Sequence, residues 1–204
     1  MQTNVPEKVV YLRDGLKSLP AYAFQGNTEI TKVVLNEGLT EIGPRAFAGC
    51  SRLREVVFPS GNKVRLQWEC FSDCVALEKV DIPDVSNIGP KAFYNCRALE
   101  TVRLPATISN IYTSAFGNCR SLKEVIFKKA RHRGWGTIYS HAFENCTSLE
   151  SIALPEGMVF YDDATFLNCE NLKRIYVHKN WYSRMKLRNC PAEIIHLGPT
   201  RSDV

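Results

Sequence analysis

Hydrophobic residues return at fixed positions along this chain, with a period of about 23 residues. A phrase of the form Ala-Phe-x-x-Cys marks each period, as in "AFGNC" at 115–119. Its aromatic members are Phe24, Phe47, Phe71, Phe93, Phe116, Phe143 and Phe166. Successive members lie 23, 24, 22, 23, 27 and 23 residues apart. Because self-similarity at a fixed period of this length is typical of repeat proteins, we expect one supersecondary unit per period.

Two apolar positions after each cysteine alternate with polar residues and predict a short strand. They stand six and eight residues after the cysteine, as Val102 and Leu104 do in "LETVRLP". A period of two is typical of a strand with one buried face, and the proline that follows in four units ends the strand because it has no N–H. We therefore predict parallel strands at Val10–Leu12, Val33–Leu35, Val56–Phe58, Val80–Ile82, Val102–Leu104, Val125–Phe127, Ile152–Leu154, Ile175–Val177 and Ile194–Leu197.

The Ala-Phe-x-x-Cys phrase predicts the opposite, convex side of each unit. It is too short for a regular helix, so we expect a single helical or 3₁₀ turn there. One more apolar residue stands five positions before each aromatic: Leu19, Ile42, Leu66, Ile88, Ile111, Ile138 and Tyr161. A single coil cannot bury these side chains alone, but stacked coils bury them against each other.

The cysteines that end the phrases occupy one periodic position: Cys50, Cys74, Cys96, Cys119, Cys146, Cys169 and Cys190. This spacing differs from zinc patterns such as Cys-x₂-Cys. Disulfides between coils would pull neighbouring coils together, because stacked side chains point the same way. We therefore expect buried free thiols that pack as small apolar groups, and no metal or cofactor. Cys70 replaces the alanine of other units, so it is also expected to pack, with a redox or metal pair with Cys74 as the alternative.

The whole pattern, exemplified by "LETVRLPATISNIYTSAFGNC" at 99–119, resembles the BspA-like class of leucine-rich repeats over nearly the entire chain. This resemblance implies a leucine-rich-repeat solenoid of the α/β horseshoe class that is mostly β. It implies a right-handed coil with a parallel sheet along its concave side. It also implies a bacterial surface or secreted protein that binds other macromolecules, although a fold alone does not fix a function.

One domain is expected over residues 1–204. Residues 1–20 should form an N-terminal strand and cap, and residues 21–178 the core repeats. Residues 179–204 should form a degenerate last repeat and C-terminal cap, because Leu187 replaces the aromatic there and terminal repeats must face water.

Composition adds few constraints. The 204 residues are 45% hydrophobic and 23% charged, which is ordinary for a soluble globular chain, and the formal net charge of +5 does not mark a nucleic-acid binder. No apolar run approaches the roughly 18 residues of a membrane span. The first residues lack the basic and apolar segments of a signal peptide, so the protein is expected to be either intracellular or a mature chain whose signal has been removed. The resemblance implies the second, a secreted or surface protein.

Sequence signals for an enzyme are missing. The chain contains no glycine-rich phosphate loop, no Gly-x-Ser-x-Gly and no His-Glu-x-x-His. Its four histidines share no metal-ligand spacing: His132, His141, His178 and His196. His141 directly precedes an Ala-Phe pair, so we expect a turn residue there rather than a catalytic base.

A solenoid offers a long sheet surface for partners, and two rows of side chains should face outward on it. The row five positions after the cysteine alternates in charge and is expected to pair with itself. The row seven positions after it is unusually apolar: Tyr11, Val34, Val57, Asp81, Arg103, Ile126, Ala153 and Tyr176. Exposed apolar strips with tyrosine and arginine are typical of interaction sites, although single exposed apolar residues are also common.

The 27-residue interval contains a basic insertion, "KKARHRGWGT" at 128–137. Its candidate binding residues are Lys128, Lys129, Arg131, His132, Arg133 and Trp135. Clustered cations in a protruding loop favour an anionic partner, and a solvated insertion is the alternative.

These features favour a recognition or adhesion module that binds a protein or glycan, rather than nucleic acid, through the concave face and the basic loop. A structural spacer that displays other domains is the alternative. We expect a monomer.

Overall fold

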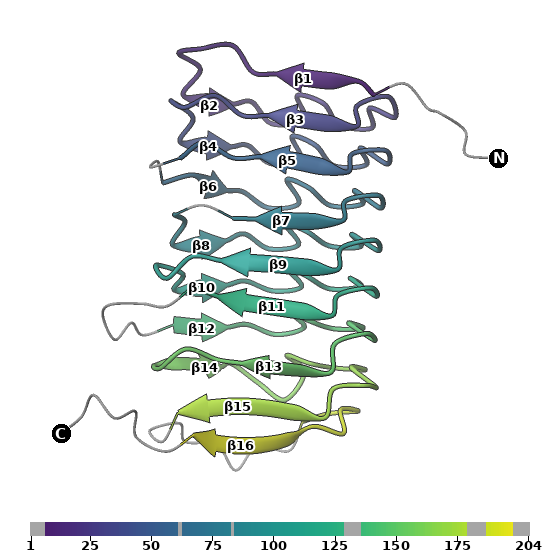
Figure 1. Cartoon of the computed structure of the whole chain (residues 1–204), viewed down its shortest axis with the longest axis vertical. Helices are drawn as coiled ribbons and strands as arrows, with labels where there is room; N and C mark the ends of the chain where they lie inside the picture. The colour runs from purple at the N-terminus through teal and green to yellow at the C-terminus, as the bar shows by residue number, and fades with distance from the viewer. Residues whose placement is uncertain (1–6, 61–62, 83, 129–135, 179–186, 198–204) are drawn as a thin grey trace.

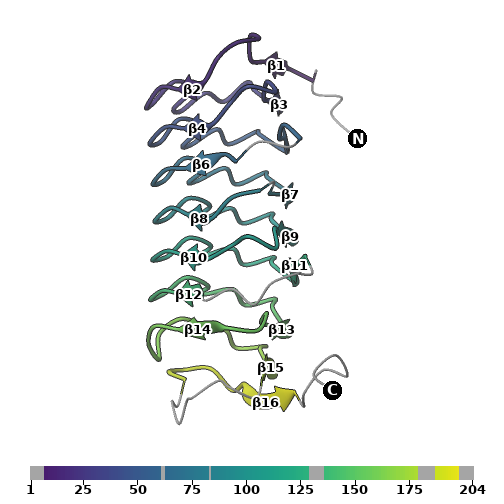
Figure 2. The same cartoon turned by 90° about the vertical axis from the view of Figure 1, so that its left-hand side faces the viewer.

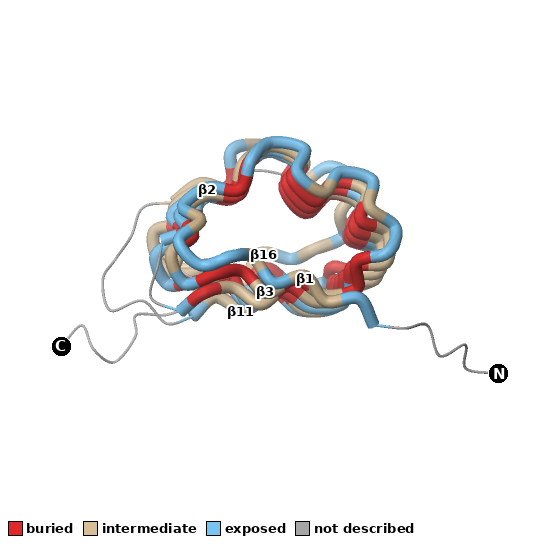
Figure 3. Tube along the Cα trace, turned by 90° about the horizontal axis from the view of Figure 1, so that it is seen from above, coloured by how far each residue is buried: buried red, intermediate tan, exposed pale blue. Residues whose placement is uncertain are grey.

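The computed structural model describes residues 7–60, 63–82, 84–128, 136–178 and 187–197. The chain winds into a column of stacked coils, with the first and last described strands at opposite ends (Figure 1). Each full coil contributes one strand to each of two opposite faces (Figure 2). Viewed along the column, buried segments of successive coils lie over one another, so the stack is almost straight (Figure 3).

The predicted strands form one face of the column, which we call the strand face. They are β1 (Val9–Tyr11), β3 (Lys32–Val34), β5 (Glu55–Val57), β7 (Lys79–Asp81), β9 (Thr101–Leu104), β11 (Glu124–Phe127), β13 (Ser151–Ala153), β15 (Arg174–His178) and β16 (Glu193–Leu197). Pairing is parallel, which confirms the solenoid prediction. Every strand starts one residue earlier than predicted, because the residue before the first inward position also joins the ladder, as Lys32 does opposite Glu55.

A second sheet lies on the opposite face and was not predicted. It runs unbroken through β2 (Ser18–Leu19), β4 (Glu41–Ile42), β6 (Arg65–Leu66), β8 (Asn87–Ile88), β10 (Asn110–Ile111), β12 (Gly136–Ile138) and β14 (Met158–Phe160). The sequence marked its inward residues, but most of its strands have two residues, too few for an alternating pattern.

The prediction of Tyr161 as the last inward residue of this set was wrong. Phe160 pairs with Ile138 and is buried, whereas Tyr161 is 65% exposed. In this coil the inward residue, Phe160, stands six positions before Phe166, whereas it stands five positions before the phenylalanine in the other coils. Counting back five positions therefore selected Tyr161, the residue after the inward one.

Successive β-turns replace the helical or 3₁₀ turn that was expected on the convex side. Arg45 and Gly49, two residues on either side of Phe47, have φ of 53° and 72°. These left-handed conformations interrupt a helix and leave turn bonds from residue i+3 to residue i, such as Cys50 N–H to Phe47 O at 3.1 Å. The segment is therefore compact without being helical.

Asparagine before the cysteine suits both the backbone and the neighbouring coil. Asn118, Asn145 and Asn168 have φ of 60°, 56° and 59°, a region that asparagine tolerates well. The Asn145 amide also donates to Asn118 Oδ1 at 2.8 Å, and the Asn168 amide to Asn145 Oδ1 at 2.9 Å. His141 has φ of 59°, which confirms it as a turn residue.

The phenylalanines of the repeat form a continuous stack through the core. From Phe24 to Phe166, neighbouring rings lie 5.2–5.5 Å apart between centroids and within 9° of parallel. All of them except Phe24, in the first coil, are fully buried. Each ring therefore covers the face of the next, and coil spacing and ring spacing are set together.

The cysteines are free thiols, and all but Cys190 are buried. Each repeat thiol that is buried lies within donor distance of the carbonyl of the preceding coil's phenylalanine, for example Cys119 Sγ to Phe93 O at 3.2 Å. Burial raises the pKa of Cys119 to about 12, so the thiol stays protonated and can donate at neutral pH. Cysteine thus combines a small apolar volume with a weak donor for a buried carbonyl.

Hydrogen bonding divides the described strand face into three sheets, ordered β1-β3-β5, β7-β9-β11 and β13-β15-β16. One break lies between β5 and β7, and the other lies between β11 and β13. The opposite sheet continues past both breaks, so the coils remain stacked where the strand face is open.

Unequal loops explain the break between β5 and β7. Seven residues connect β5 to β6 and five connect β7 to β8, whereas six connect β3 to β4. The same change appears in the sequence as phenylalanine intervals of 24 and then 22. Because adjacent coils leave these strands by different paths, the ladder opens at the carboxyl ends of β5 and β7.

One unpaired amide marks this opening. The N–H of Leu35 donates to Val57 O and that of Ile82 to Arg103 O, each at 2.9 Å. At the same repeat position, the N–H of Phe58 has no acceptor among the described residues.

We expect the Phe58 amide to exchange with solvent deuterium about tenfold faster than the amides of Leu35 and Ile82, because it lacks their ladder bond. Residue-resolved hydrogen exchange by NMR measures this directly. Equal protection of all three amides would show that the ladder is closed between β5 and β7.

Replacement of Phe116 should test the aromatic stack. Phe116 is fully buried and lies between Phe93 and Phe143, at 5.3 and 5.4 Å. Phe116→Ala should lower the free energy of unfolding by about 3–5 kcal/mol, because it leaves a cavity shared by adjacent coils. Urea denaturation measures the loss, with the exposed Tyr161→Ala as control. A loss below about 1 kcal/mol would contradict the packing described.

Candidate interaction surface

The predicted outward row lies on the strand face with its side chains directed away from the core. In β9, Val102 and Leu104 are buried and Arg103 between them is exposed. The strand registers place three groups of residues side by side: Tyr11, Val34 and Val57; Asp81, Arg103 and Ile126; Ala153 and Tyr176. None of these side chains is buried, and Tyr11 is 74% exposed. The geometry of the row is as predicted, and its role in binding stays a prediction.

The neighbouring row shows the charge pairing that its sequence favoured at one step, between β3 and β5, but not at Lys79, which has no ion-pair partner among the described residues. Lys32 Nζ lies 2.9 Å from Glu55 Oε2, between directly paired positions of β3 and β5. The hydrogen bond that Lys32 donates to Glu55 raises the pKa of Lys32, which remains charged throughout the physiological range. Glu55 is therefore partly neutralised by its own neighbour.

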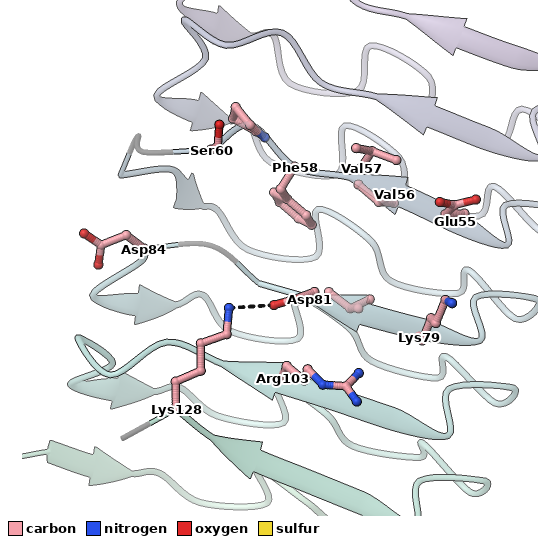
Figure 4. Close-up of a pocket in the computed structure, with 12 residues that line it drawn as sticks. Glu55, Val56, Val57, Phe58, Ser60, Lys79, Asp81, Asp84, Arg103 and Lys128 are labelled. Atoms are coloured by element: carbon pink, nitrogen blue, oxygen red, sulfur yellow. Dashed lines mark hydrogen bonds and ion pairs between the residues drawn. The ribbon is translucent and has the colours of Figure 1, made fainter. Parts of the chain in front are cut away.

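A cleft of about 590 Å³ lies on the strand face at the break between β5 and β7 (Figure 4). Its apolar wall is formed by Val57, Phe58 and Pro59. Its charged lining consists of Glu55, Lys79, Asp81, Asp84, Arg103 and Lys128. Sequence reasoning placed Val57, Asp81, Arg103 and Lys128 among the candidates but missed the cleft that joins them. The sequence signal for this cleft was the pair of unequal phenylalanine intervals, 24 residues followed by 22.

Most charges of the cleft are already partnered. Lys128 Nζ reaches Asp81 Oδ1 at 2.8 Å from the coil two positions further along (Figure 4). Asp84 accepts a hydrogen bond from the Thr107 hydroxyl. The carboxylates of Asp81 and Asp84 therefore each accept a hydrogen bond from a donor within the protein.

Two cations of the cleft, Lys79 and Arg103, differ from these partnered charges. Lys79 and Arg103 have exposed side chains, and neither has a hydrogen-bond or ion-pair partner among the described residues. Both charges are therefore available to a ligand. They are positioned by β7 and β9, whose inward residues Val80 and Val102 are buried.

The basic insertion is described only at its first residue, Lys128, and at its last two. The other candidates, Lys129, Arg131, His132, Arg133 and Trp135, lie outside the described residues.

Cys70 and Cys74 are both fully buried, and burial raises the pKa of each thiol. Neither is available as a thiolate at neutral pH, which argues against the alternative of a redox or metal pair. Within the described part of the chain, no cluster of three or more histidine, cysteine or acidic side chains has metal-site geometry. The same part contains no helix with the length and apolar character needed to cross a bilayer.

Similar folds occur in solved bacterial proteins. A leucine-rich cell surface protein from Faecalibacterium prausnitzii is 26% identical, with a TM-score of 0.56 over 61% of this chain and 33% of its own length. The pneumococcal vaccine antigen PcpA is 19% identical, with a TM-score of 0.58 over 94% of this chain and 42% of its own. A leucine-rich repeat protein from Bacteroides ovatus is 23% identical, with a TM-score of 0.53 over 92% and 59%. At these identities the last two show the fold alone.

The chain thus spans less than two thirds of the length of each of these three structures. No curated protein matches it. The family model of the BspA-type leucine-rich repeat region matches in six copies, over residues 17–133 and 86–189. Together with the parallel solenoid, the repeated phrase and the stacked core, this match shows that the chain belongs to the family of proteins with a BspA-type leucine-rich repeat region.

Proposed function

We propose that this domain is a recognition or adhesion module of a bacterial surface or secreted protein, and that it binds a protein or glycan through the strand face. The observation that carries the proposal is the outward row. It places Tyr11, Val34 and Val57 side by side on adjacent strands, followed by Asp81 and Arg103. The Faecalibacterium relative, described as a cell surface protein, supports the location.

A recognition role accounts for this row better than a spacer role does. A solenoid that only displays other domains needs a solvated outer surface, and charged self-pairing rows such as Lys32–Glu55 supply one. Apolar and aromatic side chains that face water on consecutive strands add nothing to that role. They contribute to affinity when a partner covers them, since tyrosine and arginine are typical anchors of interfaces.

The basic insertion is proposed as a second contact region, which begins at Lys128 and continues through Lys129 and Arg133. Its contribution should differ from that of the row. Exposed charges are screened over about 8 Å at physiological ionic strength, so affinity that depends on this region should fall as salt is added.

Alanine replacement of row residues tests the proposal. Purified protein is first screened against immobilised extracellular matrix proteins and glycans, and the affinity for the ligand found is then measured by calorimetry. Tyr176→Ala or Arg103→Ala should weaken binding by about 2 kcal/mol, roughly 30-fold, if that residue is an anchor. Lys173→Ala, an exposed change next to the row, is the control and should have little effect.

Two results would contradict the proposal. If a ligand is found and no variant of the row or of the insertion changes its affinity by more than about twofold, the binding surface lies elsewhere. If the screened protein binds no ligand, the spacer role is supported instead.

A further inference from the structure

We propose that the cleft between β5 and β7 binds a peptide segment of the partner in which a carboxylate stands beside an apolar side chain. The carboxylate lies between Lys79 and Arg103, and the apolar side chain packs against Val57 and Phe58. This inference rests on the proposed recognition function and assigns it a specific subsite and ligand chemistry.

The two available cations set the charge of the ligand. In Figure 4 the Lys79 side chain and the Arg103 guanidinium lie to the right of the Lys128–Asp81 ion pair, although Arg103 itself is paired in register with Asp81. A ligand carboxylate placed there accepts charge-assisted hydrogen bonds from the guanidinium and the ammonium. It displaces no internal partner, because neither cation has one among the described residues.

The rest of the lining argues against a polyanion. The cleft contains three carboxylates, of Glu55, Asp81 and Asp84, as well as its three cations. A sulfated glycan or a nucleic acid would bring several negative charges close to these carboxylates, and like charges in close approach disfavour binding. A ligand with a single carboxylate neutralises the two cations and brings no further negative charge close to the carboxylates of the cleft.

The apolar wall requires more of the ligand than a charge. Val57 and Phe58 are half-buried, so each still exposes apolar surface toward the opening. The Phe58 ring is held edge-on against the buried Phe71, at 6.3 Å between centroids and 65° between planes. A fixed aromatic side chain offers contact area at a low entropy cost. An apolar side chain of the ligand beside its carboxylate would cover this surface.

The open ladder favours a peptide as the source of these groups. The N–H of Phe58, which has no acceptor among the described residues, lies at the break. The N–H of Leu35 donates to Val57 O, and the equivalent acceptor for Phe58 would be the carbonyl of Asp81 across the break. A peptide backbone presents both donors and acceptors, so it can satisfy groups that a sheet ladder would otherwise pair. The same segment then supplies the carboxylate, the apolar side chain and the backbone contacts.

Synthetic hexapeptide libraries test the inference with the full chain. One library has a fixed glutamate followed by a mixed apolar residue, with amidated C-termini. A second has glutamine in place of the glutamate, and a third has glutamine and a free C-terminal carboxylate. Fluorescence anisotropy should show binding of the first library if a side-chain carboxylate is recognised, or of the third if a C-terminal carboxylate is recognised. The second library, which has neither carboxylate, should bind at least about tenfold more weakly.

Matched double variants locate the binding. Lys79→Gln with Arg103→Gln should weaken binding of the carboxylate library about tenfold or more, whereas Lys123→Gln with Lys173→Gln, an equal change of charge outside the cleft, should not. Circular dichroism checks that both variants are folded. The inference is overturned if neither carboxylate library binds, if both double variants bind alike, or if only heparin fragments bind and depend on Lys79 and Arg103.

Failure of this inference is distinguishable from failure of the proposed function. Tyr176 lies on the strand face outside the cleft. If Tyr176→Ala weakens binding of the natural ligand and the Lys79–Arg103 double variant does not, the recognition function stands and the cleft is not its subsite. If no variant of the cleft, of the row or of the insertion affects binding, the binding surface lies elsewhere and the proposed use of the strand face is wrong as well.

Discussion

Stacking in register is the constraint on which the rest of this structure depends. No coil encloses its own apolar side chains, so each phenylalanine ring lies on the ring of the next coil, at 5.2–5.5 Å. The same register brings each buried repeat thiol to the carbonyl of the preceding coil's phenylalanine. The aromatic contact, the thiol–carbonyl contact and the asparagine amide bond therefore recur together in successive coils. The sequence can vary freely only at positions whose side chains face water.

The repeat made the strands, the core and the outward row predictable, because alternation states directly which side chain faces inward. Arg103 between the buried Val102 and Leu104 is an example. The convex turns were misjudged because left-handed residues such as Arg45 leave no composition signal for the turn type. The second sheet was missed because its strands are too short to alternate. The cleft was missed because it depends on a difference between two adjacent loops rather than on any one motif.

Departures from the repeat, rather than the repeat itself, create the candidate site. A loop one residue longer after β5 and one shorter after β7 opens the ladder, while the opposite sheet continues and holds the coils in place. The break leaves the Phe58 N–H without an acceptor among the described residues and exposes part of its ring. A regular scaffold thus supplies rigidity, and two small changes of length supply a cleft with its own charges and shape.

Thiol accessibility tests the stacked core most directly. Burial raises the pKa of the thiols of Cys74, Cys96, Cys119 and Cys146, so they should be protonated and shielded in the folded protein. After brief maleimide labelling at about pH 8, mass mapping of the native protein should find modification only at the half-exposed Cys190. All eight cysteines should react in denaturant. Disulfides between consecutive phrases, or rapid labelling of Cys96 and Cys119 in the native state, would contradict the account.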